Sequence, residues 1–214
     1  MTHNGRRVVA AFDFDGTLTR GDTLVPFLQR LCGTSAVVRA LAAQAGAARA
    51  ALWGRVDRDA VKASLLARLL AGWDVTEVLE VVARYSDHVL ARQLRPAAVK
   101  RVAWHRDRGD HLVVVSASPE LYVEPMARRL GFDAVLATRL EAVDGKLTGS
   151  ILGANVRGRE KVRRLRAHLG DEDVALWAYG DSSGDRELLA AADVATQVSR
   201  HGLVSSSQPR TGGG

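Results

Sequence analysis

The residues with the clearest chemistry are two aspartates, Asp13 and Asp15, which follow the apolar run 8–12 and precede Gly16. An apolar run that ends at a glycine is typical of a strand buried on both faces, so the pair belongs to a strand end and a tight loop. Two neighbouring carboxylates repel each other. Either one becomes an acid and the other a base or nucleophile, or both help to hold a hard divalent ion such as Mg2+. For an isolated pair, a solvated turn is the plain alternative.

A second candidate is Ser116, at the end of the apolar run 111–116. Ser118 and Pro119 follow as the expected N-cap and first-turn proline of the next helix. Ser116 therefore stands between a strand end and a helix N-terminus, where free backbone N–H groups and the helix dipole favour a phosphate. An ordinary loop or cap serine is the alternative.

Three charged residues later in the chain complete the set of candidates. Lys161 lies on an expected helix after Gly158, where a solvated helix charge is its alternative role. Asp181 and Asp185 stand in a glycine-bounded acidic loop that follows the apolar run 174–179. Asp185 alone could also cap the next helix.

The segment DFDGTLT, residues 13–19, resembles the first motif of the haloacid dehalogenase (HAD) superfamily, whose members are mostly Mg2+-dependent phosphatases. The resemblance implies that Asp13 is the nucleophile that becomes an aspartyl phosphate. It also implies that Asp15 is the general acid and base of the reaction.

The remaining candidates match the later motifs of that superfamily in the expected order. By this resemblance, Ser116, the amide of Ala117 and Lys161 bind the oxygens of the phosphate. Asp181 of the GDSSGD segment completes an Mg2+ site with Asp13 and Asp15, the latter through its carbonyl oxygen. Asp185 supports that site through hydrogen bonds or ligand waters.

The strands and helices expected around these residues indicate a three-layer α/β sandwich with a mainly parallel, Rossmann-like sheet. We assign this core to residues 1–20 and 92–205, a helical cap to 21–91 and a disordered tail to 206–214. Apolar periodicity predicts four cap helices. Their expected N-caps are Asp22, Ser35, Asp57 or Asp59, and Asp74.

The cap position, the segment 137–140 and a hairpin with Asp144 and Gly145 at its turn resemble the type IB branch, which is phosphoserine phosphatase-like. Phosphoserine phosphatases carry a glutamate a few residues after the paired aspartates, and this chain carries Asp22 there. We expect Asp22 to contact the substrate, with helix capping as the alternative.

The chain has 214 residues, a net charge of +6 and 5% aromatic residues. Its basic residues are scattered and not interleaved with aromatics, which argues against a nucleic-acid surface and fits an anionic, phosphorylated substrate. Cys32 is the single cysteine, and no apolar stretch approaches the ~18 residues of a membrane span. These features predict a cytoplasmic protein. The sequence does not determine its oligomeric state.

Three functions follow from these observations. The leading one is a Mg2+-dependent phosphomonoester hydrolase that acts through an aspartyl phosphate on a small metabolite, phosphoserine-like or another small alcohol phosphate. The second is a phosphatase of a lipid phosphate, such as phosphatidylglycerol phosphate, at a membrane surface. The third is a non-enzymatic binding domain on a HAD scaffold.

Overall fold

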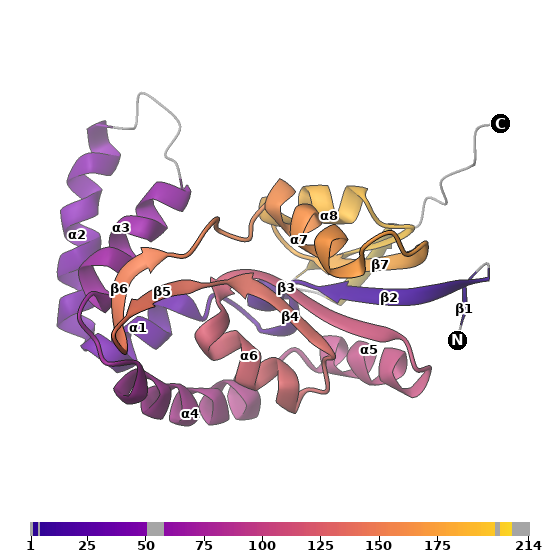
Figure 1. Cartoon of the computed structure of the whole chain (residues 1–214), viewed down its shortest axis with the longest axis horizontal. Coiled ribbons are helices and arrows are strands. Elements are labelled where there is room, and N and C mark those ends of the chain that lie inside the picture. The colour runs from indigo at the N-terminus through magenta and orange to yellow at the C-terminus, as the bar shows by residue number, and fades with distance from the viewer. Residues whose placement is uncertain (1, 4, 51–57, 200–201, 207–214) are drawn as a thin grey trace.

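The computed structural model describes residues 2–3, 5–50, 58–199 and 202–206 of the chain (Figure 1). Its centre is a seven-stranded sheet in the order β4-β3-β2-β7-β8-β9, with β1 beside β2. The strands are β1 (Thr2–His3), β2 (Arg6–Phe12), β3 (His111–Pro119), β4 (Ala134–Thr138), β7 (Val174–Gly180), β8 (Val194–Ser199) and β9 (Gly202–Ser206). Strands β4, β3, β2, β7 and β8 are parallel to one another, and β1 and β9 are antiparallel to their neighbours. The predicted mainly parallel sandwich is confirmed.

Helices cover both faces of the sheet, α7 and α8 above it and α5 and α6 below it in Figure 1. Their bounds are α5 (Pro96–Asp107), α6 (Glu120–Arg129), α7 (Arg159–Leu169) and α8 (Arg186–Ala190). Side chains of β2 alternate between the two layers, since Val9 and Ala11 pack with Leu165 of α7, whereas Phe12 packs with Val102 of α5. Strand β2 is thus apolar on both faces, as its continuous apolar run predicts.

Four helices gather at one end of the sheet (Figure 1), and we call them the cap. They are α1 (Leu24–Cys32), α2 (Thr34–Ala50), α3 (Arg58–Leu70) and α4 (Val75–Arg92). Asp74 caps α4 as expected, because its carboxylate accepts a hydrogen bond of 2.8 Å from the backbone N–H of Thr76. The division of the chain into core and cap at residues 21 and 91 stays a prediction. None of the helices in the described part of the chain combines the length and the apolar character needed to cross a membrane.

The expected N-cap of the second cap helix is wrong. Helix α2 begins at Thr34, so Ser35 lies inside its first turn. The reason is that Gly33 ends α1, while its carbonyl already accepts from Val37 N–H at 3.3 Å, so the chain enters the new helix without a spacer. For the third helix, Asp57 lies outside the described residues and Asp59 is in the first turn of α3.

The predicted hairpin consists of β5 (Leu140–Val143) and β6 (Lys146–Ile151), joined by Asp144 and Gly145 with positive φ angles. It is bonded to the cap through the backbone. Leu147 N–H donates to the Trp73 carbonyl at 2.9 Å, and the Leu147 carbonyl accepts from Gly72 N–H at 2.8 Å. The hairpin therefore ties the α3–α4 connection to the core.

The C-terminal end of the sheet was incompletely predicted. Strand β8 runs to Ser199, and β9 pairs with it antiparallel through Ser206, the first residue of the predicted tail. Ser206 therefore belongs to the sheet rather than to the predicted tail, whose residues 207–214 lie outside the described part. Pairing with an existing strand edge does not require an apolar pattern, and this explains why the polar β9 was missed.

We predict that Gly149→Ala destabilises the protein more than Gly145→Ala. Both glycines have φ near 80°, so each alanine costs about 1–2 kcal/mol of backbone strain. A Cβ at Gly149 would also lie 2.7 Å from the Cα of Ala67 on α3, whereas a Cβ at Gly145 would meet nothing within 4 Å. Urea unfolding should show an additional loss of about 1–3 kcal/mol for Gly149→Ala. Equal losses in the two variants would contradict this docking of α3 on β6.

Candidate active site

The loop after β2 places Asp13 opposite the loop after β7. Gly16 has φ of 77°, and a Cβ on it would lie 2.1 Å from a carboxylate oxygen of Asp181. Any larger residue at this position would push the two loops apart. Thr17 strengthens the contact, since its hydroxyl donates to Asp181 at 3.3 Å. The glycine that ends the strand pattern thus also allows the two loops to approach closely.

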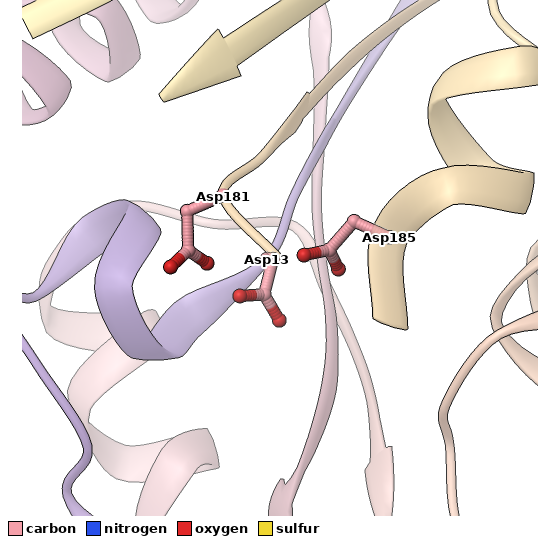
Figure 2. A group of neighbouring side chains, drawn as sticks. All are labelled: Asp13, Asp181 and Asp185. Carbon is pink, nitrogen blue, oxygen red and sulfur yellow. The ribbon is translucent and has the colours of Figure 1, made fainter. Parts of the chain in front are cut away.

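Three carboxylates meet at this edge of the sheet. Figure 2 shows Asp13, Asp181 and Asp185 pointing toward one another from the ends of β2 and β7 and from the turn Ser183–Asp185. One oxygen of each lies within 4.8 Å of the others. Asp13 and Asp185 are buried, and Asp181 is partly exposed.

Lys161 bridges two of these carboxylates from the first turn of α7. Its Nζ donates to Asp13 Oδ1 at 2.5 Å and to Asp185 Oδ1 at 2.6 Å, and its side chain is 2% exposed. The structure thus buries Lys161 instead of solvating it. The other oxygen of Asp185 accepts from the N–H and hydroxyl of Ser182 at 3.0 and 2.8 Å, so both Asp185 oxygens are engaged. Asp185 holds Lys161 and the acidic loop, and its side chain does not cap α8.

The three carboxylates outnumber the single lysine, which leaves this cluster with two uncompensated negative charges. Burial raises the pKa of Asp13 to about 7 despite the neighbouring Lys161, and burial also raises the pKa of Asp181. Carboxylate oxygens are ligands that hard divalent ions prefer, and such an ion would remove this excess charge. The donor set therefore fits Mg2+.

Asp15 turns away from this cluster toward the cap. Its Oδ1 accepts from the N–H and the hydroxyl of Thr23 at 2.8 and 2.5 Å, and its Oδ2 accepts from the hydroxyl of Ser118. Burial raises its pKa to about 6. Two aspartates only two positions apart therefore stand in different environments, one beside a cation and one among hydroxyl groups.

The prediction that Ser118 caps the following helix is wrong. Strand β3 continues to Pro119 with a shift in register after Ser116, and α6 begins only at Glu120. Pro119 occupies the N-cap position, and the Ser118 side chain bonds Asp15 instead.

Ser116 and Ala117 form the wall of the site beside Asp15. Ser116 is 1% exposed, and its Oγ accepts from the backbone N–H of Ser118 at 3.0 Å. The Ala117 carbonyl accepts a hydrogen bond from Lys62 of the cap. The loop expected to bind phosphate therefore contacts both the core and the cap.

Asp22 lies at the rim and combines the two roles considered for it. The N-cap position of α1 is Thr23, one residue later than expected. The Oδ1 of Asp22 still accepts from the first N–H groups of the helix, those of Leu24 and Val25, at 2.6 and 3.4 Å. Its side chain also lines the active-site cavity. Capping and substrate contact are thus compatible for this residue.

One cavity of about 650 Å³ is lined by every site residue that the sequence indicated. These residues are Asp13, Asp15, Asp22, Ser116, Ala117, Lys161, Asp181 and Asp185. The fold thus collects residues from four separate motifs and from the cap boundary around a single space.

Sequence reasoning missed several cations at this cavity: Arg20, Arg95 and Arg157 line it, and Lys62 bonds the carbonyl of the lining residue Ala117. Lys62 Nζ of α3 reaches the Ala117 carbonyl and Asn155 Oδ1, the latter at 2.6 Å, and burial lowers its pKa to about 8. Arg95 Nε donates to the carbonyls of Gly16 and Thr19 at 2.8 and 3.0 Å. One signal could have singled out Lys62, because the chain has only four lysines among its 30 Lys and Arg residues.

Comparisons with known proteins agree with this geometry. A family model described as haloacid dehalogenase-like hydrolase matches residues 10–190. Protein CicA of Caulobacter vibrioides is 38% identical over 190 residues, which cover 87% of this chain and 83% of that protein. A protein of Mycobacterium tuberculosis described as a probable phosphatase is 33% identical over 202 residues, 90% of this chain and 69% of that protein.

A solved structure described as a phospho-aspartyl intermediate analogue of phosphoserine phosphatase shares the fold, with a TM-score of 0.61 and 21% identity. The match covers 87% of this chain and 84% of that one. Because the family model spans most of the chain, the chain belongs to the haloacid dehalogenase-like hydrolase family, and it shares its fold with a phosphoserine phosphatase.

Proposed function

We propose that the protein hydrolyses phosphomonoesters of small molecules, with Mg2+ as cofactor and an aspartyl phosphate on Asp13 as intermediate. The observation that carries this proposal is the single cavity lined by all eight predicted residues. The solved phospho-aspartyl analogue of a phosphoserine phosphatase supports the intermediate by analogy of fold. A cytoplasmic location remains part of the proposal, on the evidence of cysteine usage.

In this proposal the carboxylates of Asp13 and Asp181 and the carbonyl of Asp15 would hold the metal ion. Asp185 supports them indirectly, since its two oxygens already bond Lys161 and Ser182. When bound, Mg2+ offsets the repulsion between the Asp13 carboxylate and the anionic phosphate.

The protein's own groups supply the remaining steps. The Ser116 hydroxyl, the Ala117 N–H and Lys161 Nζ donate to the phosphate oxygens and orient the phosphorus toward Asp13. An Asp13 oxygen attacks phosphorus while the bond to the leaving oxygen breaks. Protonated Asp15 gives its proton to that oxygen, and the alcohol leaves. The Asp15 carboxylate then takes a proton from water, whose oxygen attacks the acyl phosphate, and inorganic phosphate and Asp13 are regenerated.

The environment of Asp15 supports its role as the acid. A pKa of about 6 leaves more of this carboxyl protonated near neutral pH than an ordinary aspartate would be. Its bonds to Thr23 and Ser118 fix its direction in the cavity wall.

The first test concerns the metal. EDTA should abolish hydrolysis of p-nitrophenyl phosphate, and added Mg2+ should restore it. Mg2+ should also raise the Tm of the wild-type protein and not that of Asp181→Asn, because the ion stabilises the folded state only where its ligands are intact. Full activity in metal-free protein would refute the metal role. No hydrolysis under any condition would instead favour the non-enzymatic binding domain.

A second test separates the roles of the paired aspartates. Asp13→Asn should give no phosphoenzyme, because it lacks the nucleophile. Asp15→Asn should still form one with p-nitrophenyl phosphate, since a good leaving group needs no proton. Acid-quenched phosphoenzyme can be measured by mass spectrometry. Complete loss in both variants would contradict the assigned roles.

A third test asks whether Asp22 selects the substrate. Asp22→Asn keeps an oxygen for the N–H groups of Leu24 and Val25, so stability should be nearly unchanged. We expect kcat/KM to fall about tenfold or more for the preferred substrate in a panel of alcohol and lipid phosphates, and little for an aryl phosphate. An unaltered preference profile would leave Asp22 as a helix cap only. A wild-type preference for phosphatidylglycerol phosphate would favour the lipid alternative.

A further inference from the structure

A hydroxyl group from the cap reaches the proposed catalytic acid through one intermediate residue. Tyr85 on α4 donates from its Oη to the carbonyl of Thr23 at 2.7 Å. Thr23 in turn donates both its N–H and its hydroxyl to Oδ1 of Asp15. Tyr85 and Thr23 are both fully buried.

Thr23 forms hydrogen bonds through its carbonyl and also through its N–H and hydroxyl groups. Its carbonyl accepts from Tyr85 and also from the N–H of Phe27 at 3.1 Å, in the first turn of α1. Its N–H and side chain both point to Asp15. Since these two donors fix the position of Asp15 Oδ1, a rotation of Thr23 would move the carboxyl group with it.

The Thr23 hydroxyl has a single proton, and the bond of 2.5 Å to Asp15 uses it. The hydroxyl oxygen of Tyr122 lies 3.3 Å from Thr23 Oγ1, a longer contact than the bond from Thr23 to Asp15. Burial raises the pKa of both Tyr85 and Tyr122, which keeps them protonated as donors. The Thr23 hydroxyl therefore directs its proton to Asp15, while the Tyr85 hydroxyl directs its proton to the Thr23 carbonyl.

The ring of Tyr85 is fixed by other aromatic side chains. Phe27 lies 5.5 Å away and Tyr122 6.0 Å away, measured between ring centroids, and the Arg30 guanidinium lies over the ring at 5.7 Å. Phenylalanine at position 85 can keep these contacts, so the hydroxyl can be removed with little change in packing.

We propose that Tyr85 is a positioning residue that, through Thr23, holds Asp15 in the direction from which it protonates the leaving oxygen. The inference rests on the proposed phosphatase mechanism. By this inference the cap helix α4 contributes to the protonation of the leaving oxygen by Asp15, because Tyr85 reaches Thr23 only when α4 is packed against α1.

The test compares Tyr85→Phe with Tyr179→Phe as a matched control. Tyr179 is also buried, and its hydroxyl bonds His105 Nε2 at 2.8 Å in the layer between the sheet and α5. Each variant loses one buried hydroxyl group, and the hydroxyl of Tyr179 also interacts with Arg101 and Thr196. With 2-glycerol phosphate, a poor leaving group that needs a proton, Tyr85→Phe should lose about tenfold or more in kcat with little change in KM. With p-nitrophenyl phosphate its kcat should fall less than about threefold, and Tyr179→Phe should match the wild type on both substrates.

Thr23→Val provides the second variant, because it removes the hydroxyl that Asp15 accepts from and keeps the shape of the side chain. It should show the same dependence on the leaving group, and adding Tyr85→Phe to it should cause little further loss, since both act on one path. If Tyr85→Phe does not fold, Thr23→Val alone decides: loss confined to 2-glycerol phosphate supports the inference, and equal loss on both substrates overturns it.

Equal loss on both substrates in Tyr85→Phe, or no loss at all, would overturn the inference while leaving the phosphatase function intact. Additive losses in the double variant would also overturn it. Absence of hydrolysis by the wild-type protein on either substrate would instead overturn the proposed function itself.

Discussion

The active site depends on one buried ion-pair cluster, in which Lys161 lies between Asp13 and Asp185. Burying a charge is costly unless it is paired, and removing one partner of a buried pair costs ~3–5 kcal/mol. Lys161 therefore bonds two carboxylates at once, offsets one of their negative charges, and fixes α7 against the loops that follow β2 and β7. With Asp181 included, the cluster remains negative, and this charge is what a divalent cation would balance.

The sheet makes this cluster possible. Because β2 and β7 are parallel neighbours, their carboxyl ends lie at the same edge, and their two acidic loops meet there. The same edge is where the chain leaves for the cap and returns from it. The outgoing and returning segments pair through Thr19 and Leu94, and Arg95 holds the carbonyls of Gly16 and Thr19. The cap is thus joined to the backbone that carries the aspartates.

The identical side chains of Asp13 and Asp15 stand in different surroundings. Asp13 lies beside Lys161, which favours its ionised form against the effect of burial. Asp15 accepts only from neutral donors, the N–H and hydroxyl of Thr23 and the hydroxyl of Ser118. Without a metal ion, burial raises the pKa of Asp13 to about 7 and that of Asp15 to about 6, so these surroundings alone do not make Asp13 the nucleophile and Asp15 the acid. A divalent cation bound beside Asp13 would favour its ionised form and so separate the proposed roles.

The sequence by itself predicted most of the elements and eight members of the site. Apolar periodicity, caps and glycines depend on neighbours in the chain, so they predicted strands such as β2 and β7, the hairpin turn at Asp144 and Gly145, and the cap of α4 at Asp74. The order of the motifs, together with the position of Asp22 after the paired aspartates, selected eight of the residues that line the cavity. Ser35 and Ser118 were misassigned as caps, because a capping residue type does not by itself show where a helix begins.

Only the tertiary structure decided which groups meet across long stretches of chain. Ser118 bonds Asp15 across 103 positions, Tyr85 bonds Thr23 across 62, and Lys62 bonds Ala117 across 55. Strand β9 forms because an edge of β8 offers backbone partners. Such contacts arise from the packing of one element on another, which local residue patterns do not encode, and they determine the direction of Asp15, the placing of the cap and the surroundings of the cavity.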